Sequence, residues 1–176
     1  ILGKSLFAGA QGNVFGLDTS LTPDLAGFDL DTFLASLHHS PTIAARHTVG
    51  LVDPITAGDL DADARVNDGL PETLEEVIAT YGVDHFKLKV GGDMDADIAR
   101  LKQIAAVLDP LPSYVATLDG NEQYQNVEGI SALWDAIEAD PDLARLREAV
   151  RFIEQPIARA NAFSADVTEL AARKSI

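Results

Sequence analysis

The chain has 176 residues, of which 47% are hydrophobic and 23% charged, and this balance predicts a soluble globular domain with a substantial core. The formal net charge of −15 argues against nucleic acid or an anionic membrane as a partner, because both require a basic surface. Cysteine is absent, which restricts any metal ion to oxygen and nitrogen ligands and favours a hard cation. No apolar run is long enough to span a bilayer, so we expect a cytoplasmic protein.

Both ends of the sequence suggest part of a longer protein. Residues 1–3 open the chain without an initiator methionine, and the only methionine is Met94. The last residues follow a predicted helix, where an alternating strand and helix pattern next requires a strand. We therefore expect further residues beyond Ile176.

Residues 1–43 form a lead-in segment, followed by 44–176, where strands and helices alternate. Glycines and turn formers predict irregular structure over 1–30, and a short helix is expected over Asp31–Leu37. The strands expected from apolar and β-branched runs are 44–52, 85–90, 114–118 and 151–154. The helices expected from apolar spacing and caps are 71–81, 93–108, 126–137, 143–150 and 165–174, and 57–68 is expected to be an acidic loop.

Two lysines occupy one face of the second expected strand. Side chains alternate along a strand, so Lys87 and Lys89 share the face opposite to the apolar side chains at 86, 88 and 90. A buried strand tolerates two ammonium groups poorly, because each must be desolvated and they repel each other. Either this face meets solvent and carboxylates, or the lysines serve chemistry.

Helices between successive strands imply parallel strands with right-handed crossovers. This pattern suits either a doubly wound sheet or part of a (β/α) barrel, and in both folds ligands bind at the C-terminal ends of the strands. Lys87, Lys89, Asp119 and Glu154 all fall at such ends.

The two carboxylates offer hard oxygen ligands for Mg²⁺, or they simply neutralise the lysines. A neighbouring cation favours the neutral form of an amine, so Lys89 can act as a base near neutral pH beside Lys87, which can also bind an anion. A metal ion on Asp119 and Glu154 would add to this effect and would stabilise an enolate.

Three motifs in this order resemble barrel strands two, three and four of the enolase superfamily, in its mandelate racemase and muconate-lactonizing branch; they are 87–89 (KLK), 118–121 (LDGN) and 152–156 (FIEQP). The resemblance implies a TIM-type (β/α) barrel with Mg²⁺, in which Lys89 is the base and Lys87 its electrostatic helper. Asp119 and Glu154 would then be the first two metal ligands, with Asn121 and Gln155 close to the metal or substrate. Gly120 departs from the alanine that the family more often has, a change not expected to disturb metal binding.

The same resemblance implies that 44–176 is the first half of the barrel and that 1–43 is a lead-in or the end of an N-terminal capping region. The third carboxylate ligand and the residue opposite Lys89 would lie beyond Ile176. The 176 residues alone are therefore expected to be inactive.

The leading hypothesis is Mg²⁺-dependent removal of the proton next to the carboxylate of a small carboxylic acid, in a racemase, cycloisomerase, epimerase or dehydratase. The full-length protein is expected to be a homo-oligomer that binds neither nucleic acid nor membrane. One alternative is a metal-free aldolase in which Lys89 forms a Schiff base. Another is a barrel without catalytic activity.

Overall fold

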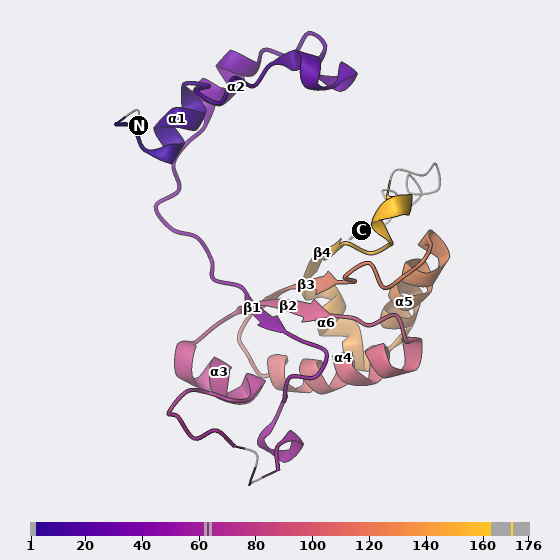
Figure 1. Ribbon diagram of the computed structural model, residues 1–176. Helices are drawn as coiled ribbons and strands as arrows, with labels where there is room; N and C mark the ends of the chain where they lie inside the picture. The colour runs from indigo at the N-terminus through magenta and orange to yellow at the C-terminus, as the bar shows by residue number, and fades with distance from the viewer. Residues whose placement is uncertain (1–2, 62, 64, 163–169, 171–176) are drawn as a thin grey trace. The chain divides into compact units, whose positions relative to one another are not determined.

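The computed structural model describes residues 3–61, 63, 65–162 and 170 (Figure 1). Contacts between residues divide the chain into two units, Ile1–Ile43 and Ala44–Ile176. Within the described residues, no helix is long and apolar enough to cross a membrane.

The first unit contains two short helices, α1 (Leu6–Gln11) and α2 (Leu30–Ser36), and two 3-10 turns, η1 (Thr19–Leu21) and η2 (Pro23–Leu25). The expected helix over 31–37 is confirmed with a shift of one residue, and Asp29 caps it. The expectation of irregular structure throughout 1–30 is wrong at α1. A helix this short is marginal by itself, and it is held by the Ser5 cap and by a hydrogen bond from Gln11 Nε2 to the Leu37 carbonyl at 2.8 Å.

The second unit is built on a parallel four-stranded sheet in the order β1-β2-β3-β4. Its strands are β1 (His47–Val49), β2 (His85–Lys89), β3 (Val115–Asp119) and β4 (Val150–Glu154). Each strand lies beside the next one in the sequence. This sequential order is typical of a (β/α) barrel, whereas in a doubly wound sheet the strand order reverses at a switch point. The prediction of parallel strands is therefore confirmed.

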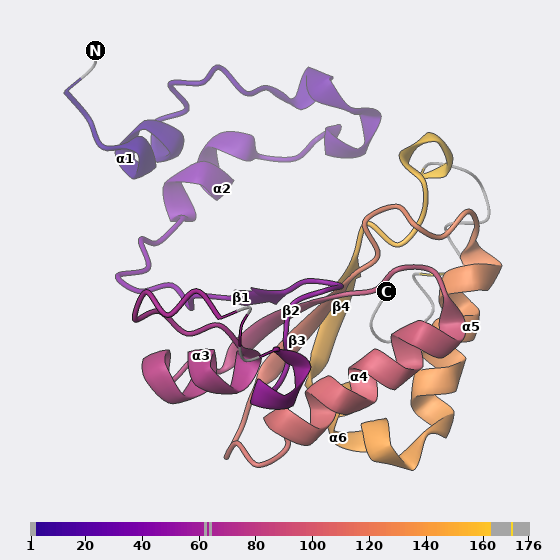
Figure 2. The same ribbon diagram turned by 60° about the horizontal axis from the view of Figure 1, so that its bottom comes forward.

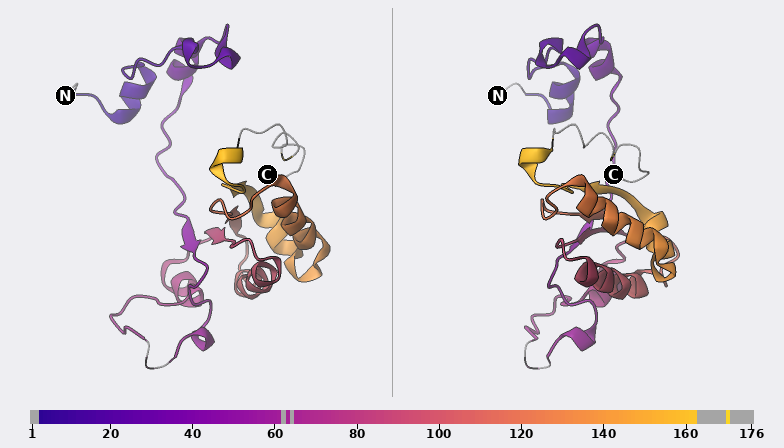
Figure 3. Two further views of the ribbon diagram at one scale, coloured as in Figure 1. Left: turned by 45° about the vertical axis from the view of Figure 1, so that its right-hand side comes forward. Right: turned by 90° about the vertical axis from the view of Figure 1, so that its right-hand side faces the viewer.

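Helices cover one face of this sheet (Figures 2 and 3). They are α3 (Leu74–Tyr81), α4 (Met94–Leu108), α5 (Val127–Ala139) and α6 (Ala144–Ala149). The unit also contains the 3-10 turns η3 (Ala57–Asp59), η5 (Pro141–Leu143) and η6 (Arg159–Asn161), of which η6 follows β4. Between the helices and the sheet lies the core, whose largest fully buried side chains are Phe86, Ile55, Leu88, Leu101, Ile104, Leu108, Leu118, Ile130, Leu133, Ile137, Leu143 and Leu146.

Several predicted boundaries differ from the structure. The first strand is shorter than 44–52, because the chain turns after Val49, where the Gly50 N–H donates to Asp53 Oδ2 at 2.7 Å. The third helix begins at Leu74 rather than near 71, since Thr73 supplies the cap. The helix expected over 165–174 lies outside the described residues.

Candidate active site at the C-terminal edge of the sheet

Three charged residues form one row across neighbouring strands. Lys89 pairs with Asp119 in the β2–β3 register, and Asp119 pairs with Glu154 in the β3–β4 register. Each is the last residue of its strand. Residues paired in a parallel sheet point to the same face, so the row lies on the face opposite to the helices. The structure therefore brings together three of the residues that the sequence selects.

A β-bulge turns Glu154 onto this face. Val150 pairs with Ala116 and belongs to the core, and strict alternation from Val150 would place Glu154 on the same, helix-covered face. Between the pairs Ala116–Val150 and Leu118–Ile153, β4 contains an extra residue. The extra residue shifts the alternation, and Glu154 comes into register with Asp119.

Lys87 lies between the two carboxylates. Its Nζ is 2.7 Å from Asp119 Oδ2 and 3.3 Å from both carboxylate oxygens of Glu154. The Asp119 carboxylate first, and Glu154 to a lesser extent, hold the pKa of Lys87 above its ordinary 10.5 against the opposing effect of burial. Lys87 is thus a stable cation, and it neutralises the two acids.

Asp119 is almost completely buried, with 1% of its surface exposed. Burial alone would raise the pKa of its carboxyl group, but the contact with Lys87 and the hydrogen bond from the Asn121 N–H outweigh burial, and the pKa lies below the ordinary 3.8. The Oδ2 atom accepts no hydrogen bond of good geometry, so its close contact is the ion pair with Lys87. Asp119 is ionised, with one oxygen not fully used by the protein.

Asn121 connects the base candidate to the loop after β3. Its Oδ1 accepts a hydrogen bond from Lys89 Nζ at 2.6 Å, and its backbone N–H donates to Asp119 Oδ1 at 3.0 Å. Asn121 and Glu122 have φ values of 45° and 63°, in the left-handed region that residues other than glycine rarely adopt. Backbone strain of this kind gathers at functional sites, and here it directs the Asn121 side chain towards Lys89.

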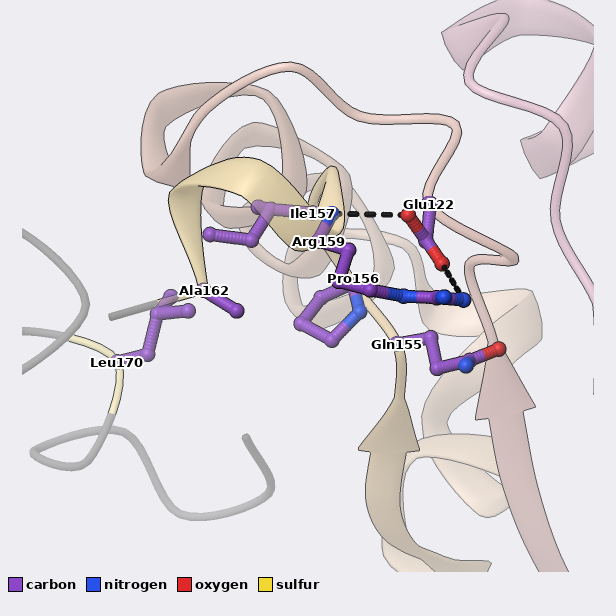
Figure 4. A pocket seen from close by; sticks show the side chains of 7 residues that line it. All are labelled: Glu122, Gln155, Pro156, Ile157, Arg159, Ala162 and Leu170. Carbon is purple, nitrogen blue, oxygen red and sulfur yellow. Dashed lines mark hydrogen bonds and ion pairs between the residues drawn. The ribbon is translucent and has the colours of Figure 1, made fainter. Parts of the chain in front are cut away.

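Gln155 follows Glu154 and also has a positive φ, 45°. Its carbonyl accepts a hydrogen bond from the Glu122 N–H at 2.9 Å, and its side chain lines a cavity of about 340 Å³ at the end of β4 (Figure 4). Pro156 and Ile157 give this cavity an apolar wall, and Arg159 pairs with Glu122 at 2.7 Å at its rim. Gln155 is thus placed beside the row rather than between Lys89 and the carboxylates.

Arg46 also reaches this site, although its place in the sequence did not indicate it. Its guanidinium donates to Thr117 Oγ1 at 2.9 Å and to Glu154 Oε2 at 3.3 Å. Alternation places Arg46 on the same face as Thr48, which pairs with Lys87. That alternation was visible in the sequence, but the reach of Arg46 to Glu154 depends on the order of the strands.

The donors fit a hard divalent cation. Asp119 and Glu154 offer carboxylate oxygens from adjacent positions of the sheet edge, and Mg²⁺ prefers oxygen ligands and usually keeps several waters. Among the residues that the structure describes, no group of three or more His, Asp or Glu side chains is gathered closely enough to hold a metal ion. The two carboxylates can therefore supply part of a magnesium site but not a three-carboxylate one.

A parallel sheet covered by helices on one face, with charged residues at its C-terminal edge, defines an α/β protein of the partial TIM-barrel type. A comparison with protein families matches residues 69–175 to the family described as enolase C-terminal domain-like. The chain belongs to this family, and so to the enolase superfamily, whose members are generally enzymes. The match does not distinguish the mandelate racemase from the muconate-lactonizing branch. No curated protein and no solved structure matches the chain.

Proposed function

We propose that this chain carries one side of a Mg²⁺-dependent active site that removes the proton next to the carboxylate of a small carboxylic acid. The observation that carries the proposal is the row of Lys89, Asp119 and Glu154 on three neighbouring parallel strands. It places an amine beside hard oxygen donors, in a chain of the enolase superfamily. The reaction class is that of a racemase, cycloisomerase, epimerase or dehydratase.

Lys89 is the base. Its Nζ is oriented by Asn121 Oδ1 at 2.6 Å, so the amine is held at the edge of the sheet where a substrate would approach. The neutral amine can take the proton from the substrate carbon. Lys87 stays protonated, so its charge can compensate for the negative charge that develops on the substrate.

Asp119 and Glu154 would hold Mg²⁺, with a third carboxylate from residues outside this chain. When bound, the metal supplies Lewis-acid stabilisation of the negative charge that forms on the substrate carboxylate. Lys87 contacts both carboxylates in this structure, so it would have to share them with a bound metal ion. Gln155, which follows Glu154 and lines the neighbouring cavity, would contact the part of the substrate away from the reacting carbon.

The test is exchange of the substrate α-proton with deuterium in D₂O, followed by proton NMR, with the full-length protein and a panel of small carboxylic acids. We expect exchange that requires Mg²⁺ and stops with a chelator. Lys89→Ala should lower the exchange rate by about 10²–10⁴-fold, the range for loss of a general base. Lys102→Ala is the matched control, because Lys102 forms its ion pairs on the helix layer, and it should leave the rate unchanged.

Other outcomes would replace this proposal. Borohydride trapping of a carbonyl substrate on Lys89 without a metal requirement would support the Schiff-base aldolase. Unchanged turnover in both Lys89→Ala and Glu154→Gln would contradict every function that uses this row. We also propose that the full-length enzyme is a homo-oligomer, which sedimentation would test.

A further inference from the structure

A buried carboxylate, Asp97, lies outside the charged row and joins two of the loops that follow the strands of this row. Asp97 lies in the first turn of α4 and is 4% exposed. Its Oδ1 accepts a hydrogen bond from the Gly91 N–H at 2.7 Å, and its Oδ2 accepts from the Gly92 N–H at 2.9 Å. The Tyr124 hydroxyl donates to the same Oδ2 at 2.8 Å. The cap of α4 is a different residue, Asp93, so Asp97 is not needed to begin the helix.

Tyr124 remains a hydrogen-bond donor throughout the physiological range. Burial, and then its contact with Asp97, hold the pKa of Tyr124 well above its ordinary 10.0. Burying a carboxylate is costly unless donors satisfy it, and here three donors do so. An apolar side chain at this position would leave the Gly91 and Gly92 N–H groups and the Tyr124 hydroxyl without an acceptor, so Asp97 connects these three groups.

The first loop connected is the one between β2 and α4, directly after Lys89. The Val90 N–H donates to the Asp119 carbonyl at 3.0 Å, which ties the start of this loop to the end of β3. Gly92 has a φ of 87°, and a Cβ there would lie 3.3 Å from the Cβ and the carbonyl oxygen of Gln123. The loops after β2 and β3 are therefore in direct contact at a position that favours glycine.

Tyr124 extends the connection to the chain after β4. Its carbonyl accepts a hydrogen bond from the Ala158 N–H at 3.0 Å, and it pairs with Ile157 in an isolated parallel bridge. The side chain of Tyr124 thus reaches Asp97 on one side, while its backbone holds the segment that follows Glu154 on the other. One buried contact joins the loops after three consecutive strands.

We propose that Asp97 and Tyr124 are positioning residues, which together hold the loops after β2, β3 and β4 at the spacing that the charged row requires. The inference rests on the proposed function, since it takes that row as the active site. Neither side chain touches the reacting atoms. A displacement of about 1 Å can lower a rate by about 100-fold, so the anchoring of Lys89 against Asn121 affects the rate without changing the chemistry.

The chain offers a matched pair of variants. Tyr114 is a second buried tyrosine, and its hydroxyl donates to Asp109 at 2.8 Å, but it lies before β3, at the opposite end of the sheet. Tyr124→Phe and Tyr114→Phe each remove one hydrogen bond of the same kind, from a tyrosine hydroxyl to a carboxylate. In the full-length Mg²⁺-loaded enzyme we expect Tyr124→Phe to lower kcat by about 10- to 100-fold with little change in KM. Tyr114→Phe should leave kcat unchanged, although it should lower Tm about as much as Tyr124→Phe does.

A second readout does not depend on turnover. The rate at which acetic anhydride modifies Lys89, measured by mass spectrometry, reports how firmly its amine is held. We expect it to rise in Tyr124→Phe and Asp97→Asn and to stay unchanged in Tyr114→Phe, with Lys4 as an exposed reference amine.

Equal kcat and equal Lys89 reactivity in the two phenylalanine variants would overturn the positioning role. If the wild-type protein catalyses no Mg²⁺-dependent exchange, the proposed function fails, and the reactivity of Lys89 still decides whether Asp97 and Tyr124 position it. If Asp97→Asn does not fold, Tyr124→Phe, which removes a single hydroxyl, decides the question alone.

Discussion

At the scale of single residues, Lys87 contacts the two carboxylates that are proposed to hold Mg²⁺. Its Nζ is 2.7 Å from Asp119 Oδ2, and because Asp119 is buried, solvent and salt screen this ion pair only weakly. The sequence analysis left open whether the acids neutralise the lysines or form a site. The structure shows neutralisation of Lys87, and a cation bound to the same oxygens would compete with it.

This competition predicts the effect of Lys87→Met on metal binding. Removing the ammonium leaves Asp119 and Glu154 without their shared cation and removes its repulsion of the metal. A hydrogen bond to a charged group contributes about 1.5–3 kcal/mol, so Mg²⁺ should bind at least about tenfold more tightly. Calorimetric titration of the full-length protein measures this, and kcat should fall at the same time because the substrate loses the cation that compensates its developing negative charge.

Arg46→Met is the matched control for that experiment. Arg46 contacts Glu154 at 3.3 Å and does not bridge to Asp119, and its side chain is 36% exposed. Its removal should change Mg²⁺ affinity much less than removal of Lys87. Equal affinities for Mg²⁺ in the wild type and in Lys87→Met would show that the lysine and the metal do not share ligands.

At the scale of elements, the ends of β3 and β4 fit closely at Gly120. A Cβ built on Gly120 would lie 3.0 Å from the Gln155 carbonyl oxygen and 3.0 Å from Pro156 Cα, both of which are backbone atoms. The sequence analysis treats this glycine as a minor departure from a family that more often has alanine. In this chain, however, the segment after Glu154 occupies the space of the missing methyl group.

Gly120→Ala should therefore displace the segment after β4. Overpacking of this kind typically costs about 1–3 kcal/mol, and we expect a lower Tm together with weaker Mg²⁺ binding because Glu154 moves. Gly58→Ala is the control, since a Cβ there would meet only Thr56 Oγ1 at 3.5 Å. Thermal unfolding and calorimetric titration of both variants test the prediction, which fails if Gly120→Ala behaves like Gly58→Ala.

A second prediction at this scale concerns the pH dependence of helix packing. Lys102 on α4 pairs with Asp140 at 2.8 Å and Asp142 at 3.1 Å, which follow α5. The contact with Asp140 holds the pKa of Lys102 above 10.5, and Lys102 holds the pKa of Asp140 below 3.8. The stabilisation by Asp140 is therefore complete above pH 3.8 and is lost as the pH falls through its lowered pKa. The stabilisation by Lys102 is complete below pH 10.5 and is lost as the pH rises through the raised pKa of Lys102.

The measurement is the Tm difference between the wild type and Lys102→Met. It should be small at neutral pH, because partly exposed ion pairs contribute little, and should shrink further in high salt. It should decrease as the pH falls below the ordinary pKa of an aspartate and disappear below the lowered pKa of Asp140. A difference that persists there would assign the effect to packing of the lysine stem instead of its charge.

At the scale of the whole molecule, the described sheet ends at β1 on one side and β4 on the other. Unpaired strand edges present rows of free N–H and C=O groups and favour association. We therefore expect the isolated polypeptide 1–176 to self-associate and to show no Mg²⁺-dependent proton exchange. Analytical ultracentrifugation and the NMR assay test this, and a stable active monomer would contradict it.

The predictable part of the fold follows from local rules. Alternation along 85–90 placed both lysines opposite the core, because side-chain direction in a strand depends only on parity. The predicted helix starts at 93 and 126 are also local features, since Asp93 and Asn126 cap these helices by accepting from a backbone N–H three residues away. The short α1 was missed because its stability comes from contacts with residues distant in sequence.

The sequence by itself determined the parallel α/β alternation and the set of charged groups at the strand ends, because periodicity is a local property, and three motifs added the resemblance to the enolase superfamily and so the barrel. The tertiary structure alone decided how those groups meet. The bulge that turns Glu154 towards Asp119, the reach of Arg46 and the buried contact between Asp97 and Tyr124 all depend on the register between strands. Register is set by packing over the whole sheet, and a shift of one residue reverses the face of every side chain.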